Sequence, residues 1–206
     1  MTRPILRTLS LGLAAAVSAA ALSGCAALVV GGAVGTALMV ADRRTSGAVL
    51  EDQAIELKAM NRVRDVLGER GHVSPTSYNR TLLMTGEVPT EADRSAAERA
   101  VAGIDNLKGV VNELAVMGNT SLTARSNDSI LSGKVKASFI DAKDLHANAV
   151  KVVTERGTVY LMGRVTEREA TRATDIARGV SGVQKVVRVF EILSEAELAT
   201  QEPARR

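Results

Sequence analysis

Hydrophobic and polar positions in the second half of the chain follow two different periods, and each period predicts one kind of element. Residues 128–140 carry apolar side chains about every 3.6 positions, which predicts an amphipathic helix. Its apolar positions are Ile130, Leu131, Val135 and Phe139. Residues 149–154 and 158–165 alternate instead, which predicts two strands joined by a turn. Gly157 suits this turn because glycine adopts a positive φ without steric cost.

A capping pattern marks the start of a second helix in the same region. Thr166 is followed three residues later by Glu169, and this spacing lets the two side chains cap the first turn reciprocally. Apolar residues continue with helical spacing to Val180, and Ser181-Gly182 ends the helix. Residues 183–193 are predicted to form a final strand, so the order is helix, strand, strand, helix, strand.

The same order of elements occurs twice, because the chain contains an internal repeat. Residues 80–88 align with residues 157–165 at an offset of 77, and residues 108–112 align with 184–188 at an offset of 76. The predicted fold class is therefore α+β, with two tandem small αββαβ units, each a three-stranded sheet covered by two helices. The predicted divisions are the first unit at 51–117, a polar linker at 118–126, the second unit at 127–193 and a disordered tail at 194–206.

The first 24 residues have the three parts of a secretory signal peptide. Two arginines precede an apolar stretch at residues 9–22, and Leu22-Ser23-Gly24-Cys25 follows it. These last four residues resemble the bacterial lipobox, which implies cleavage before Cys25 and lipidation of Cys25. Residues 25–50 then form an apolar, glycine-rich tether. An uncleaved transmembrane anchor is the alternative, because apolar residues continue through 26–41, although three glycines within that stretch weaken it.

Several short segments of the repeat resemble the BON family of small periplasmic modules. They are the acidic start of the first helix, Gly157 in the turn, Leu161-Met162-Gly163-Arg164-Val165 and Gly182-Val183-Gln184-Lys185-Val186-Val187. The first unit departs from the family at Arg80, where glycine is usual, which leaves the turn and ligand surface of that unit undecided.

The lipobox followed by two such units is similar to the dual-BON outer-membrane lipoproteins of proteobacteria. The residue after Cys25 is Ala26 rather than Asp, which in a Gram-negative host implies the outer membrane. The resemblance therefore implies a lipid-anchored, periplasm-facing protein that binds phospholipid surfaces. It also implies a role in maintaining the envelope under stress and near division sites.

Net charge separates the two units. Residues 51–117 hold 8 basic and 11 acidic side chains, and residues 127–193 hold 11 and 8, so their net charges are −3 and +3. An anionic bilayer should attract the second unit, at about 1 kcal/mol per basic side chain near the surface. We expect the first helix of the second unit to dock on anionic phospholipid through Ile130, Leu131, Lys134, Lys136 and Phe139. In the alternative interpretation, the apolar residues face the core and the lysines are solvated.

Composition and motifs argue against several other classes of function. Aromatic residues make up 2% of the chain and Trp is absent, which argues against a base-stacking nucleic-acid module. His72 and His146 lie far apart in the sequence, so no metal site is predicted, and no catalytic constellation or cofactor is predicted either. The residues predicted to be structural are Gly86, Gly157, Gly163 and Gly182. The alternative function is a scaffold or adaptor that binds an outer-membrane assembly, cell-wall or division-site protein through the first unit; an envelope hydrolase is the least favoured.

Overall fold

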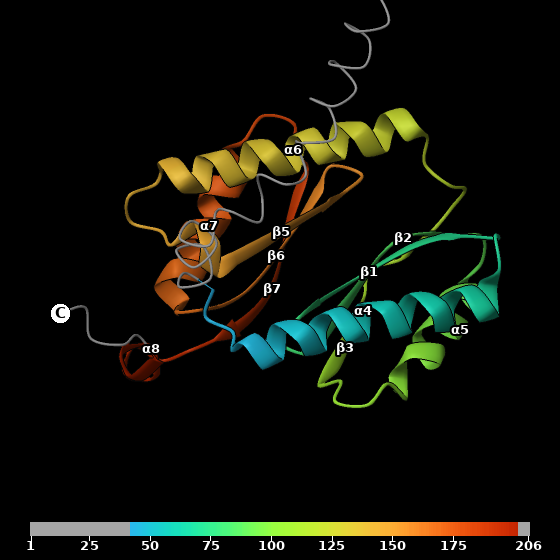
Figure 1. Ribbon diagram of the computed structural model, residues 1–206. Coiled ribbons are helices and arrows are strands. Elements are labelled where there is room, and N and C mark those ends of the chain that lie inside the picture. Colours follow the sequence, from blue (N-terminus) through green and yellow to red (C-terminus); the bar gives the residue numbers. More distant parts are fainter. Residues whose placement is uncertain (1–41, 202–206) are drawn as a thin grey trace, which may run out of the picture. The chain divides into compact units, whose positions relative to one another are not determined.

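A computed structural model describes residues 42–201, which contain both repeats (Figure 1). The predicted signal peptide, Cys25 and most of the predicted tether lie outside the described residues, as do residues 202–206. The described residues belong to one compact unit. No helix within them is both long and apolar enough to cross a membrane.

The first unit is a hairpin extended by a parallel strand and covered by two helices. Its elements are α4 (Ser46–Leu67), β1 (His72–Tyr78), β2 (Thr81–Val88), α5 (Glu91–Ala102), β3 (Gly109–Asn112) and β4 (Ala115–Val116). β1 pairs antiparallel with β2, and β2 pairs in parallel with β3 and β4. The pairing is parallel because the chain returns through α5, and a helical crossover restores the direction of the first strand.

The second unit repeats this arrangement. Its elements are α6 (Leu122–Asp141), the short 3-10 helix η2 (Ala147–Ala149), β5 (Val150–Glu155), β6 (Thr158–Val165), α7 (Glu167–Gly179) and β7 (Lys185–Ile192). β5 pairs antiparallel with β6, and β6 pairs in parallel with β7 along its full length. The prediction of two tandem αββαβ units in an α+β fold is confirmed, although the first sheet has a fourth, two-residue strand, β4, beyond the three that were predicted.

Helix boundaries differ from the prediction in three places. α4 begins at Ser46, inside the predicted tether, and α6 begins at Leu122, inside the predicted linker. Thr45 and Ser121 cap them, since each hydroxyl accepts a hydrogen bond of 3.2 Å from the backbone N–H three residues later. Small polar residues suit both linkers and helix caps, so composition did not separate the two. The predicted disordered tail is wrong over Glu195–Gln201, which forms α8.

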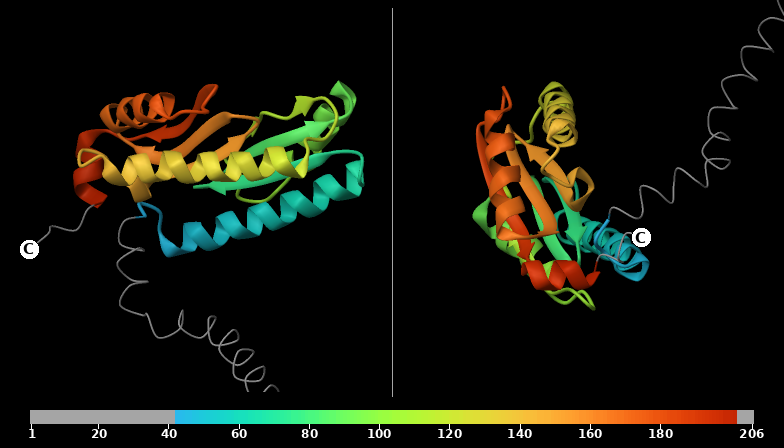
Figure 2. Two further views of the ribbon diagram at one scale, coloured as in Figure 1. Left: turned by 90° about the horizontal axis from the view of Figure 1, so that it is seen from above. Right: turned by 90° about the vertical axis from the view of Figure 1, so that its left-hand side faces the viewer.

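Three clusters of buried apolar side chains hold the compact unit together. In each repeat, one cluster fills the space between the sheet and its helices. The third cluster joins the two sheets and is built on Tyr78, Leu83, Tyr160 and Met162. Figure 2 shows the strands of both units in the middle of the compact unit, with helices around them. Along β6, Leu161 faces the helices while its two neighbours face the other sheet, as the two-residue period of a strand requires. Residues 42–206 thus carry a core of their own.

Two arginines follow Asp42 at the start of the described chain, and each binds a different repeat. Arg43 donates two hydrogen bonds to the carboxylate of Glu169 on α7, at 2.7 and 2.8 Å. Arg44 donates to the carboxylate of Asp52 on α4 at 2.8 Å, and its guanidinium lies 4.2 Å from the centre of the Tyr78 ring. The segment that leads into α4 is therefore fixed to both units.

Candidate functional site

An acidic residue beyond the first turn of α6 binds the hairpin turn of its own unit. The two carboxylate oxygens of Asp128 accept hydrogen bonds from the backbone N–H groups of Arg156 and Gly157, both at 2.8 Å. These N–H groups belong to a two-residue turn, so β5 and β6 leave them without a partner in the strand ladder. Asp128 therefore fixes the position of the turn against the helix.

The first unit has the same arrangement despite its different turn residues. Asp52 accepts hydrogen bonds from the backbone N–H groups of Asn79 and Arg80, at 2.8 and 2.7 Å. Asn79 and Arg80 have φ angles of 49° and 69°, and Arg156 and Gly157 have 50° and 69°. The turn that the sequence left undecided is thus kept. Arg80 adopts this left-handed conformation at a cost of about 1–2 kcal/mol relative to a right-handed one.

Two of the four structural glycines lie inside strands, where a backbone carbonyl of a neighbouring segment approaches closely. A Cβ atom on Gly86 would lie 2.0 Å from the carbonyl oxygen of His72, and one on Gly163 would lie 2.4 Å from that of Ala149. Neither contact is possible without moving the backbone. Gly182 has a φ of 103°, which disfavours any other residue.

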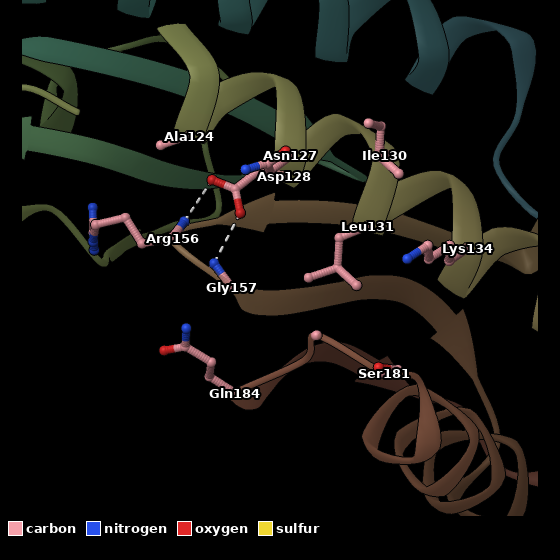
Figure 3. A pocket seen from close by; sticks show the side chains of 11 residues that line it. Ala124, Asn127, Asp128, Ile130, Leu131, Lys134, Arg156, Gly157, Ser181 and Gln184 are labelled. Carbon is pink, nitrogen blue, oxygen red and sulfur yellow. Dashed lines mark hydrogen bonds between the residues drawn. The ribbon is translucent and has the colours of Figure 1, made fainter. Parts of the chain in front are cut away.

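An open groove of about 540 Å³ lies beside α6 in the second unit (Figure 3). α6 contributes Ile130, Leu131 and Lys134 to one side of the groove. Gly157 of the turn and Gly182 of the α7–β7 loop lie on the other side, where the absence of side chains keeps the space open. No group of three His, Cys, Asp or Glu side chains suited to a metal occurs among the described residues.

The structure brings three of the five predicted lipid-contacting residues to this groove. Ile130 is 58% exposed, and Lys134 is exposed beside it. Leu131 is 7% exposed and forms part of the groove wall rather than an inserting side chain. The apolar side chain of Ile130 and the ammonium group of Lys134 therefore lie at the same rim of the groove.

The other two predicted contacts are wrong. Phe139 is fully buried in the core of the second unit, because it lies on the same face of α6 as Leu131 and Val135. Lys136 donates hydrogen bonds to the backbone carbonyls of Ala147 and Val150, so it ties α6 to the start of β5. Burial lowers the pKa of the Lys136 ammonium group.

Two exposed apolar residues of α6 were missed. Leu122 is 78% exposed and Ile140 is 66% exposed. At about 100° per residue, they and Ile130 fall within one quarter of the helix circumference. The exposed positions between them, such as Gly133 and Ala137, carry no charge. The predicted helix began at residue 128, so Leu122 lay outside it.

Glu155, the last residue of β5, titrates in an unusual range. It is 6% exposed, and burial, reinforced by the negative charge of Glu87, raises its pKa from 4.5 to about 6. Between these pH values the folded protein binds more protons than the unfolded chain, so this carboxyl destabilises the fold as pH rises. We expect Glu155→Gln to raise the free energy of unfolding by about 1–2 kcal/mol at pH 7.5 and to change it little at pH 4.5.

Urea denaturation of the wild type and the Glu155→Gln variant across this pH range measures the difference. Glu195→Gln is the control, because the side chain of Glu195 is 67% exposed. A stability difference that is the same at pH 4.5 and pH 7.5 would contradict the assignment.

Comparison with known proteins identifies the repeats. A family model of the BON domain matches residues 52–118 and 127–194. The outer membrane lipoprotein DolP of Haemophilus influenzae is 38% identical over 84% of this chain and 90% of its own length. The 21 kDa hemolysin of Actinobacillus pleuropneumoniae is 30% identical over 72% of this chain and 78% of its own. The osmotically-inducible protein Y of Escherichia coli is 25% identical over 68% of this chain and 72% of its own length. The chain therefore belongs to the BON domain family and contains two BON domains.

Proposed function

We propose that this protein is an outer-membrane lipoprotein, anchored through Cys25 and facing the periplasm, that binds anionic phospholipid through its second unit. Its role would be to help maintain the cell envelope by binding rather than by catalysis. One observation carries the proposal: Ile130, in the exposed apolar row of α6, lies with Lys134 at the open groove. The relative from Haemophilus influenzae, named an outer membrane lipoprotein, supports the location.

The expected affinity is modest and reversible. Burying an aliphatic side chain such as that of Ile130 in the bilayer interface gains at most about 1.5–3 kcal/mol, and a lysine near anionic headgroups adds about 1 kcal/mol. A lipid anchor on Cys25 would hold the second unit near the bilayer at a high local concentration, so tight binding by α6 is unnecessary.

Sedimentation with vesicles tests the proposal on the compact unit, residues 42–206, which lacks the anchor. We expect salt-sensitive binding to phosphatidylglycerol vesicles and little binding to phosphatidylcholine vesicles. Lys134→Glu should lower the bound fraction at least fivefold. Lys58→Glu is the matched control, because Lys58 is exposed on α4 at the equivalent position, 76 residues earlier.

Two outcomes would contradict the proposal. Equal losses from Lys134→Glu and Lys58→Glu would mean that net charge, rather than the α6 surface, governs binding. Absence of binding to either kind of vesicle would leave Cys25 as the sole membrane contact in the proposal.

A second candidate function is a scaffold that acts through the first unit. The outer face of α4 carries Leu50, Leu57 and Met60, which are 67%, 60% and 49% exposed, in a unit of net charge −3. An exposed apolar row of this kind is typical of a protein-binding surface.

If this candidate is right, a Leu57→Glu, Met60→Glu variant should keep its vesicle binding. The same variant should fail to restore resistance to detergents in cells that lack the protein. Full restoration of resistance would contradict the scaffold function, and loss of vesicle binding would assign α4 to the membrane instead.

A further inference from the structure

The groove of the second unit has a smaller counterpart in the first. There, the start of α4, Arg80 and Asn106 surround a hollow of about 270 Å³, half the volume of the groove beside α6. The offsets of the repeat place Glu51 opposite Asn127, Arg80 opposite Gly157 and Asn106 opposite Gly182.

The backbone around the two hollows follows the same pattern. The N–H of Lys108 donates to the carbonyl of Arg80 at 2.8 Å, and the N–H of Gln184 donates to the carbonyl of Gly157 at 2.9 Å. The loop before the last strand takes a positive φ at the same place in both units, 63° in the first and 103° in the second. The difference in volume therefore comes from the side chains that line the two hollows.

Those side chains cross the hollow of the first unit. The amide nitrogen of Asn106 donates to the carboxylate of Glu51 at 3.1 Å, which joins the loop to α4. Arg80 lines the same hollow, where the second unit has Gly157. No such bridge is possible in the second unit, because Gly182 has no side chain.

We propose that Glu51, Arg80 and Asn106 close the groove of the first unit and thereby restrict binding of phospholipid headgroups to the second. This inference rests on the proposed function and adds the residues that determine which of the two units binds phospholipid. The lysine at the groove does not distinguish the two units, because the first unit has Lys58 at the position equivalent to Lys134. Filling the groove removes the space that a headgroup would occupy and places the carboxylate of Glu51 in it.

A graft tests the proposal in residues 42–206. The host carries Lys134→Glu, which under the proposed function lowers the bound fraction at least fivefold. The graft adds the four residues of the open groove: Glu51→Asn, Ala54→Ile, Arg80→Gly and Asn106→Gly. Because the graft removes one negative and one positive charge, the net charge of the host does not change.

We expect the graft to recover at least half of the binding to phosphatidylglycerol vesicles that the host has lost, and a further Lys58→Glu to abolish it again. A control with Ala54→Ile alone in the host should stay unbound. A graft that unfolds cooperatively but binds no better than its host, while the unsubstituted unit binds, would overturn the inference and leave the proposed function standing. If the unsubstituted unit itself does not bind, the proposed function fails, and the inference fails with it.

The reverse change gives a second test that does not depend on the stability of the graft. Asn127→Glu with Gly182→Asn installs the bridge of the first unit in the groove of the second, and Asn tolerates a positive φ better than most residues. We expect this variant to lose at least fivefold in bound fraction. Unchanged binding by a variant with a wild-type circular dichroism spectrum would overturn the inference.

Discussion

Replacing Asp52 with alanine is expected to lower the free energy of unfolding of residues 42–206 by about 3–5 kcal/mol. The carboxylate is buried and accepts hydrogen bonds from the backbone N–H groups of Asn79 and Arg80. It also accepts from the hydroxyl of Ser77 and the guanidinium of Arg44. Alanine would leave these donors without their shared acceptor, and several of them are buried away from water.

Urea denaturation followed by circular dichroism measures this loss. Asp65→Ala is the control, because Asp65 is an exposed residue of the same helix, and its removal should change stability by less than about 0.5 kcal/mol. Asp128→Ala should lie between the two, at about 2–3 kcal/mol, since Asp128 binds the two N–H groups of its turn. A loss below about 1 kcal/mol for Asp52→Ala would show that the turn holds its position without the carboxylate.

Replacing Arg156 with alanine should cost a similar amount, about 3–5 kcal/mol, but at the contact between the two units. Glu87 of β2 is fully buried, and Arg156 reaches it from the turn of the second unit with an N–O distance of 2.9 Å. Arg156 also donates to the carbonyl of Gly86 at 3.0 Å. Alanine would leave the buried carboxylate of Glu87 without its guanidinium partner. In the unfolded chain this carboxylate is hydrated, so the substitution would shift the folding equilibrium toward the unfolded state.

The cause can be separated from lost packing by a second substitution. Glu87→Gln in the Arg156→Ala background removes the uncompensated charge and should recover at least half of the lost stability. Arg168→Ala serves as the control, because the side chain of Arg168 is 66% exposed and 4.0 Å from its carboxylate partner. If Glu87→Gln brings no recovery, the loss comes from the guanidinium's contacts with the backbone instead.

The sequence predicted the elements well because each has a strong local signal. The alternating strands, the Thr166–Glu169 capping box and the internal repeat all depend on residues close together in the chain. The surface of α6 was harder to predict, since the helical period identifies an apolar face but not the angle at which it meets the sheet. Phe139 and Ile130 both fit the period, yet one is buried and the other is 58% exposed.

Long-range partners explain the remaining differences. Lys136 was predicted to contact lipid because its acceptors, the carbonyls of Ala147 and Val150, lie across an irregular loop and are not apparent from the sequence. The acidic residue that was predicted to start the first helix of each unit is recognisable by family resemblance. Its role is not visible in the sequence, because the turn that it binds lies 27 to 29 residues further along the chain. Glu87 and Arg156 are 69 residues apart, and no sequence pattern connects them.

The two arginines at the start of the described chain determine how the protein would bear a mechanical load. Under the proposed anchoring, any pull between the membrane and the body passes along the tether and reaches Arg43 and Arg44 first. Arg43 passes the load to α7 and Arg44 to α4, so both units share it from the start. Tension on the anchor would therefore act on the body as a whole, and would not peel the first unit away from the second.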